Sequence, residues 1–226
     1  GVDIDVHAVE VSKFSLLIKL IEDETPASVK ECVPILPDLS SNIKNGNSLI
    51  CREDIHGKEL PIEVLCNIKP FEWETINGGA KFDAIVGNPP YVKTEDKHTL
   101  ETEEEFAVYK KKYKSAYKQF DKYFLFLEKA FDLLKEDGQM CYIVPNKFYK
   151  IGAGQELRRI TAKYVSKLDD FGDMQLFPDK TIYSCIITLC KECNKQLQYT
   201  NVISLTDLWT GEEQENIEIK NEMLDE

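Results

Sequence analysis

The stretch FDAIVGNPPY, at residues 82–91, decides the fold. Residues 82–86 are a short, mostly apolar run of the kind that forms a buried strand. Two prolines then end this strand, because proline has a fixed φ angle and no amide hydrogen for the strand ladder. In an open α/β sheet, ligands bind at the carboxyl ends of the strands. We therefore expect residues 88–91 to lie at a binding site.

The loop Asn88-Pro89-Pro90-Tyr91 has the chemistry to hold a planar amino group. Its prolines stiffen the backbone and leave carbonyl oxygens without ladder partners. The Asn88 side chain adds an acceptor oxygen beside them, and Tyr91 offers a flat face on which a ring can stack. Two converging acceptors fit an amino group with two N–H donors. The alternative is a rigid loop with a packed tyrosine.

Strands and helices alternate along the rest of the chain. Besides 82–86, strands are expected at residues 1–5, 42–50, 139–144, 167–172 and 182–190, and helices at residues 6–22, 60–67, 119–136 and 153–165. This alternation predicts an α/β domain with a largely parallel sheet.

The composition is that of an ordinary globular protein, with 226 residues, 42% of them hydrophobic and 30% charged. No apolar run approaches the roughly 18 residues of a membrane helix. The seven cysteines are an odd number without a disulfide-like layout, which indicates reduced thiols. We expect a cytoplasmic protein with no membrane partner. Cys190 and Cys193 form a lone CxxC without a second pair, so no metal site is predicted.

Residues 82–91 resemble the catalytic motif of amino-methyltransferases that use S-adenosyl-L-methionine. More narrowly, most of residues 1–192 resemble the N6-adenine-specific DNA methyltransferases of type II restriction-modification systems, including the nuclease-fused type IIG enzymes. The resemblance implies a Rossmann-like methyltransferase sheet with helices on both faces, incomplete at the N-terminus. It also implies double-stranded DNA as a partner, together with a fused or partner restriction nuclease.

The resemblance assigns cofactor-binding roles to five residues. Asp3 would bind the ribose hydroxyls, with Ile4 beside the adenine. Asn47, followed by Ser48, stands where the family usually has an acid that contacts the cofactor's adenine. Phe126 would line the cofactor pocket. The alternatives are a helix cap for Asp3, a turn residue for Asn47 and simple core for Phe126.

The same resemblance assigns the catalytic roles. Residues 88–91 match the family motif in full, and Phe177 would stack on the flipped base opposite Tyr91. The implied reaction transfers a methyl group to the N6 amino group of a flipped adenine in DNA. The alternative for Phe177 is a buried turn residue. The rival functions are an amino-methyltransferase acting on protein glutamine or RNA, and a non-catalytic DNA-binding scaffold.

The net charge of −12 argues against a surface that binds polyanions all over, but one stretch is basic. Residues 109–123 contain six lysines and a single acid. Five of these lysines either follow the DNA backbone or form a solvated helix face, namely Lys110, Lys111, Lys112, Lys114 and Lys118. The same two alternatives stay open for Arg158 and Arg159.

Residues 1–193 are predicted to be the catalytic domain, and residues 194–226 a linker or the start of a target-recognition domain. From Gly211 onward the chain holds seven acids and one lysine. The family's glycine-rich first motif, which cradles the cofactor, has no match and would lie upstream of Gly1. We therefore expect an N-terminally truncated piece that binds cofactor weakly or not at all and is inactive alone. The Gly152-Ala-Gly154 stretch predicts only a loop before a helix.

Overall fold

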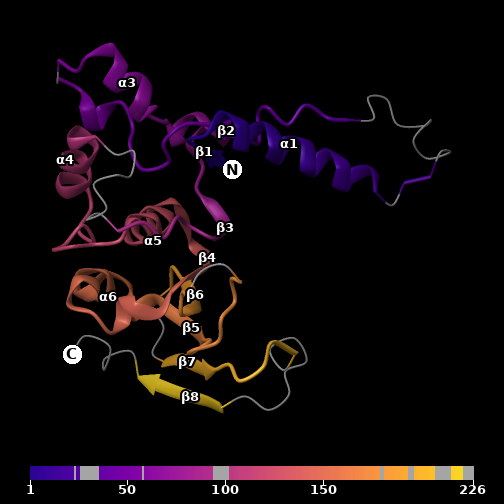
Figure 1. The fold of residues 1–226 in the computed structure, drawn as a ribbon, viewed down its shortest axis with the longest axis vertical. Helices are drawn as coiled ribbons and strands as arrows, with labels where there is room; N and C mark the ends of the chain where they lie inside the picture. The colour runs from indigo at the N-terminus through magenta and orange to yellow at the C-terminus, as the bar shows by residue number, and fades with distance from the viewer. Residues whose placement is uncertain are drawn as a thin grey trace. The chain divides into compact units, whose positions relative to one another are not determined.

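The computed structural model divides the chain into two compact units, shown as a ribbon in Figure 1. The first unit holds residues 1–80 and 102–108, and the second holds residues 81–101 and 109–226. The structure describes residues 1–22, 24–25, 36–57, 59–93, 102–178, 181–192, 196–206 and 215–220.

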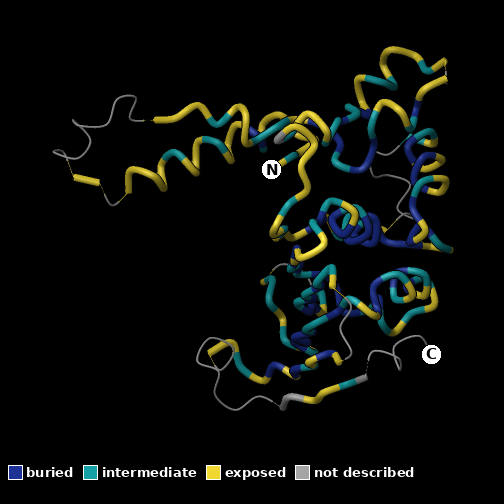
Figure 2. Tube along the Cα trace, turned by 180° about the vertical axis from the view of Figure 1, so that it is seen from behind, coloured by how far each residue is buried: buried dark blue, intermediate teal, exposed yellow. Residues whose placement is uncertain are grey.

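The first unit begins with two short parallel strands, β1 (Val2–Asp3) and β2 (Lys44–Asn45). Helix α1 (Val6–Ile21) follows β1, close to the predicted range. Asp5 caps this helix, since its side chain accepts a hydrogen bond from the His7 amide. Most apolar side chains of α1 are exposed, and Figure 2 shows the helix coloured largely as exposed or intermediate.

Buried side chains of the first unit occur in the segment after β2 and at the end of the next helix. Helix α3 (Ile62–Ile68) forms near its predicted range. Its last residue, Ile68, is fully buried, as are Leu49 and Ile50 in the segment after β2. Helix α4 (Glu103–Lys112) starts in this unit and continues into the second unit.

The second unit contains a six-stranded sheet with the order β3-β4-β6-β5-β7-β8. Its strands are β3 (Phe82–Gly87), β4 (Leu134–Pro145), β5 (Val165–Asp170), β6 (Ser184–Cys190), β7 (Gln196–Asn201) and β8 (Glu215–Lys220). This confirms the α/β class and the presence of a strand at residues 82–86. The strand is not buried as predicted, because β3 is an outer strand of the described sheet, and Val86 is 80% exposed. The largely parallel arrangement was wrong: only β3 with β4 and β5 with β7 are parallel, and the other three pairings are antiparallel.

The mixed sheet has a physical cause in the connection between β5 and β6. Parallel neighbours need a crossover, usually a helix, whereas antiparallel neighbours need only a loop that reverses the chain. The described part of residues 171–183 contains no helix, so β6 returns antiparallel beside β5. Strand β6 then lies between β4 and β5 and runs against both.

Two helices of the second unit complete its core. Helix α5 (Lys122–Leu133) packs on β4 and buries most of its side chains, including Phe124 and Leu127. It is shorter than the predicted 119–136, because Leu134 already begins β4. Residues 135–138 lie at an irregularity in the pairing of β3 with β4, between the partners Leu134 and Gln139. Helix α6 (Gln155–Thr161) lies between two short 3-10 turns.

The described part of residues 194–226, predicted to be a linker or the start of a target-recognition domain, contains two strands. Strands β7 and β8 extend the sheet beyond β5. The assignment of this stretch to a target-recognition domain stays a prediction. Among the helices in the described ranges, none combines the length and apolarity that a membrane crossing requires.

Candidate active site

The Asn-Pro-Pro-Tyr loop leaves β3 where the strand runs beside β4. Gly87, the last residue of β3, is paired with Tyr142. A Cβ atom at Gly87 would lie 2.9 Å from the Tyr142 ring, so only glycine fits at this close approach. The next residue, Asn88, is exposed, and no described residue hydrogen-bonds to its side chain. The strand end thus presents an amide with its hydrogen-bonding capacity unused.

The far end of this loop is held by the start of α5. The Lys122 amide donates to the Val92 carbonyl at 2.9 Å, and Lys93 forms an antiparallel bridge with Asp121. The buried Asp121 carboxylate in turn pairs with Lys147 at 2.7 Å. The loop is therefore fixed at both ends, by β3 and by α5.

Tyr91 is half-buried and packs among aromatic rings. Its hydroxyl donates to the Ile143 carbonyl at 2.9 Å. Its ring lies edge-to-face with Tyr123, at 6.1 Å between centroids, and with Phe177, at 6.4 Å. Burial, with a smaller effect of Cys185, raises the pKa of Tyr91 to about 12, so the hydroxyl stays protonated as a donor.

The structure thus brings together Tyr91 and Phe177, which lie far apart in the sequence. Phe177 sits at the end of the described loop of residues 171–178, and Asp179 and Lys180 beyond it lie outside the described residues. The two ring planes are inclined by 69°. The pair predicted to hold a base is therefore adjacent but not parallel.

A buried carboxylate that the sequence reasoning missed orders the start of this loop. Asp170, the last residue of β5, accepts a hydrogen bond from the Gly172 amide at 3.1 Å. It also accepts hydrogen bonds from the Asn146 amide at 2.9 Å, the Tyr199 hydroxyl at 3.1 Å and the Tyr149 hydroxyl. Burial by itself raises the pKa of Asp170, but the accepted hydrogen bonds outweigh it and leave the pKa below its usual value. The available signal in the sequence was an acid at the end of one strand and an asparagine directly after another.

The predicted cofactor residues Asp3 and Ile4 lie in the first unit. The Asp3 carboxylate accepts the Asp5 amide at 2.8 Å, and Asp5 rather than Asp3 caps α1. The cap alternative for Asp3 is therefore not realised. Asp3 and Ile4 are both exposed.

Asn47, unlike Asp3 and Ile4, is buried and hydrogen-bonded within the protein. It is 5% exposed, and its side chain donates to Glu105 at 3.1 Å and accepts from the Leu49 amide at 3.0 Å. The second bond closes a local turn, as in the alternative reading. The neighbouring Ser48 is half-buried, and its carbonyl accepts the Trp73 indole N–H at 2.9 Å. A contact from Asn47 to a cofactor would have to use the remaining N–H or lone pair of a side chain that is only 5% exposed.

Phe126 lies on α5 in the second unit. It is only half-buried, whereas its neighbours Leu125 and Leu127 are fully buried. This exposure distinguishes it from the plain core positions of the helix. Its role in a cofactor pocket stays a prediction.

Several basic residues have structural partners. The Lys110 amine donates to the Ala116 and Lys118 carbonyls, each at 2.9 Å, and Arg158 donates to the Phe148 and Ile151 carbonyls. Lys110 and Arg158 therefore stabilise the backbone, and their contact with DNA stays a prediction. Lys111, Lys114, Lys118 and Arg159 are exposed, and Lys112 is half-buried over the Tyr113 ring. Within the described ranges, no cluster of His, Cys, Asp or Glu could hold a metal ion.

One family model and several known proteins match this chain. The model for the Eco57I restriction-modification methylases matches residues 1–177. The type II restriction enzyme and methyltransferase RM.Eco57I from Escherichia coli is 45% identical over 204 residues, covering 89% of this chain and 20% of the relative. The type II methyltransferase M.BstVI from Geobacillus stearothermophilus is 39% identical over 85 residues, covering 37% of this chain and 14% of the relative.

A solved structure shares the fold. The type IIG restriction endonuclease BpuSI superimposes with a TM-score of 0.52 at 14% identity, over 81% of this chain and 21% of that chain. At this identity the likeness concerns the fold alone. The chain thus spans about a fifth of the length of RM.Eco57I and of BpuSI.

Proposed function

Since this chain belongs to the Eco57I restriction-modification methylase family, we propose that it forms the part of a DNA methyltransferase that holds the amino group to be methylated. The observation that carries the proposal is the exposed Asn88 amide at the carboxyl end of β3, on the loop that also carries Tyr91. RM.Eco57I and M.BstVI are methyltransferases by name, which supports the same reaction class here.

The proposed substrate atom is N6 of adenine. Its lone pair is delocalised into the ring, so the free amine is a poor nucleophile. The Asn88 side-chain oxygen and the Pro89 carbonyl would accept its two N–H bonds, favour a tetrahedral nitrogen and aim the lone pair outward. S-adenosyl-L-methionine, when bound, supplies an electrophilic methyl group. The N6 nitrogen, held by Asn88 and Pro89, would form the new bond to this methyl carbon as its bond to sulfur breaks, the demethylated cofactor would leave, and the N6 proton would pass to solvent.

An adenine in duplex DNA must leave the base stack to reach this loop. Tyr91 and Phe177 would hold the flipped base between them, and such stacking contributes about 1–3 kcal/mol per base. A base between two parallel rings needs ring planes about 7 Å apart, twice the roughly 3.5 Å contact distance of carbon atoms. Because the two rings now meet edge-to-face, base entry requires at least one of them to turn.

The chain's exposed first-unit residues fit a cofactor in part. Asp3 offers carboxylate oxygens that accept hydroxyl donors, and Ile4 offers apolar surface for a ring. Ser48, which is half-buried, retains access for a contact. Asn47 fits least, because both ends of its amide are bonded within the protein.

Double-stranded DNA is the proposed partner, with a restriction nuclease in the same polypeptide. RM.Eco57I is named as both restriction enzyme and methyltransferase, which supports the fused arrangement. A target-recognition domain would supply the choice of DNA sequence.

To test this, the full gene is expressed in a host, and the host DNA is digested to nucleosides and analysed by mass spectrometry. We expect N6-methyladenine with the wild type and a loss of at least about 100-fold with Asn88→Ala, the scale seen when one stabilising hydrogen-bond partner is removed. Asn67→Ala, at an exposed position on α3, is the matched control. Methylated glutamine or RNA in place of methylated adenine would refute the proposed substrate. Undiminished methylation by folded Asn88→Ala would refute the assigned residue.

A further inference from the structure

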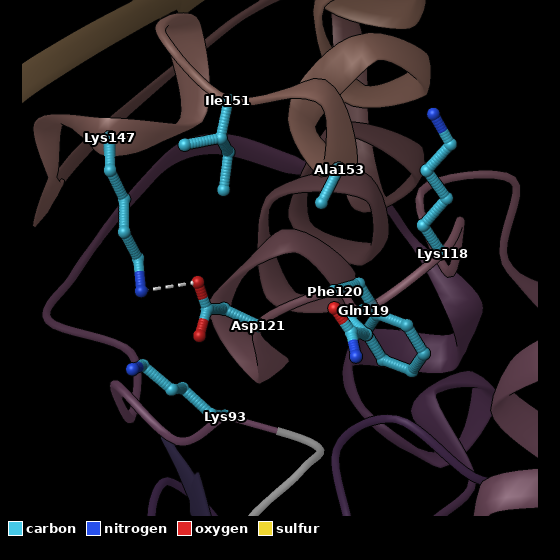
Figure 3. A pocket seen from close by; sticks show the side chains of 8 residues that line it. All are labelled: Lys93, Lys118, Gln119, Phe120, Asp121, Lys147, Ile151 and Ala153. Atoms are coloured by element: carbon cyan, nitrogen blue, oxygen red, sulfur yellow. Dashed lines mark ion pairs between the residues drawn. The ribbon is translucent and has the colours of Figure 1, made fainter.

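A pocket of about 380 Å³ opens in the second unit next to the Asn-Pro-Pro-Tyr loop. Figure 3 shows the side chains that line it. Three of them are lysines, Lys93, Lys118 and Lys147, and one is a carboxylate, Asp121. Three positive groups against one negative group make this pocket cationic in a chain whose net charge is −12.

The carboxylate neutralises only part of this charge. Asp121 pairs with Lys147 at 2.7 Å and is buried. Lys93 and Lys118 are both exposed. In the view of Figure 3, Lys147 and Lys118 lie on opposite sides of the pocket with Asp121 between them. The Lys118 ammonium lies over the Tyr117 ring, 5.0 Å from its centroid, so an anion in the pocket would meet Lys93 and Lys147 directly and Lys118 after its exposed side chain turns.

The backbone at Lys118 is held in an uncommon conformation. Its φ angle is +50°, which costs a non-glycine residue about 1 kcal/mol or more. The Lys110 amine stabilises this turn by donating to the carbonyls of Ala116 and Lys118. Strain that the surroundings hold in place is a common mark of a functional position. One lysine thus fixes the backbone from which another reaches the pocket.

The pocket is joined to the catalytic loop. Lys93 follows Tyr91 by two residues, and its backbone pairs with Asp121. Whatever occupies the pocket therefore lies beside the segment that carries the proposed base-binding tyrosine. Phe120 and Ile151 add apolar surface to the wall.

We propose that this pocket binds a backbone phosphate of the DNA strand that carries the flipped base. The proposal rests on the proposed function and names a contact which that function does not specify. Ammonium groups are strong partners for phosphate oxygens, and an apolar wall suits the adjoining sugar. The pocket lies at the small end of ligand sites, about 300–1,000 Å³, which matches one phosphate with its sugar. Holding this phosphate would fix the strand while the neighbouring base swings out.

The test measures the salt dependence of DNA binding by fluorescence anisotropy, with the protein as its gene encodes it and a labelled duplex DNA as the probe. The variant Lys93→Gln/Lys118→Gln removes two charges, keeps much of the side-chain length and leaves the backbone requirement at residue 118 unchanged. We expect the slope of log affinity against log salt to shrink by up to about 0.9, because each neutralised phosphate adds about 0.9 to it and the pocket is proposed to hold one. The matched control, Lys81→Gln/Lys163→Gln, removes two exposed charges that do not line the pocket and should leave the slope unchanged.

A slope equal to that of the wild type in the folded pocket variant would overturn the proposal, and so would an equal reduction in the control. Inorganic phosphate that binds through the same lysines without any change in the DNA slope would assign the pocket to free phosphate, which also overturns it. Asn88→Ala separates the two proposals, because it should abolish methylation and leave the salt slope intact. A changed slope in a protein that methylates no adenine would support the pocket and reject the substrate.

Discussion

Asn47 and Asn88 are the same residue type in two units of the molecule, and each follows a strand. Asn47, two residues after β2, is buried with its amide bonded to Glu105 and Leu49. Asn88, directly after β3, is exposed, and its side chain has no partner in the part of the chain that the structure describes.

The difference shows that position after a strand does not assign a role by itself. A buried polar side chain that is hydrogen-bonded within the protein contributes to folding, and removing it leaves buried partners unsatisfied. A preorganised side chain with unused hydrogen-bonding capacity is available to a substrate. The comparison predicts stability effects at the first kind of position and activity effects at the second.

The largest expected effect is on activity at Asn88. Asn88→Ala should lower methylation at least about 100-fold and change the free energy of unfolding by less than about 0.5 kcal/mol, as for an ordinary surface substitution. Methylation assays beside urea denaturation measure both quantities. A drop in stability as large as that of a buried substitution would break the comparison.

Asp170 extends the comparison to a polar group in the second unit that accepts four hydrogen bonds. Asp170→Asn should lower the free energy of unfolding by about 1.5–3 kcal/mol, because hydrogen bonds to a charged acceptor are removed. The exposed Asp173→Asn is the control, and should be close to neutral in urea denaturation.

The stability of the protein in acid should also depend on the Asp170 carboxylate. The accepted hydrogen bonds hold the pKa of Asp170 in the folded protein below the usual value of an aspartate, so its ionised form stabilises the fold above that usual value. This contribution disappears as the pH falls through the folded-state pKa, and the decline should be smaller in Asp170→Asn. Urea denaturation repeated at a series of acidic pH values measures it. An identical acid dependence in variant and wild type would contradict the assignment.

A third change tests why this chain has an asparagine where its relatives are expected to have an acid. Asn47→Asp would place a carboxylate against the buried Glu105, which now receives the Asn47 amide. The free energy of unfolding should fall by about 1–3 kcal/mol, since a donor is removed and a like charge is added. Adding Glu105→Gln restores a donor and should recover most of the stability. A double variant as unstable as the single variant would rule out this pairing as the cause.

The smallest effect is expected at the Tyr91 hydroxyl. Tyr91→Phe removes the bond to the Ile143 carbonyl and keeps the ring, so about 0.5–1.5 kcal/mol is at stake. Activity should therefore fall by about tenfold or less, and Tyr91→Ala should fall further because stacking is removed as well. Equal values of kcat/KM for Tyr91→Phe and Tyr91→Ala would show that the Tyr91 ring does not contribute to base binding.

The sequence predicted those elements whose side-chain pattern repeats with a clear period. The apolar face of α5 and the apolar run of β3 are local signals of this kind. Strands β7 and β8 carry polar and acidic residues, so they lack the apolar pattern by which a strand is predicted from sequence. The direction of β6 depends on how the chain turns between β5 and β6, and the local sequence pattern does not predict this direction.

The candidate site divides in the same way. The place of residues 88–91 followed from the strand before them, and a known motif linked Phe177 to Tyr91. The hydrogen bonds to Asp170 and the strained backbone at Lys118 depend on tertiary packing. The residues proposed to touch substrate are therefore easier to predict from the sequence than the residues that hold them in place.

The hydrogen bond from the Lys122 amide to the Val92 carbonyl gives the catalytic loop its own reporter. This amide belongs to the first turn of α5, where a helix leaves its N–H groups without partners inside the helix. Its protection from exchange with deuterated solvent therefore depends on the loop staying in place. Hydrogen–deuterium exchange at this single amide would measure how often the loop opens, in a protein with no DNA and no cofactor bound.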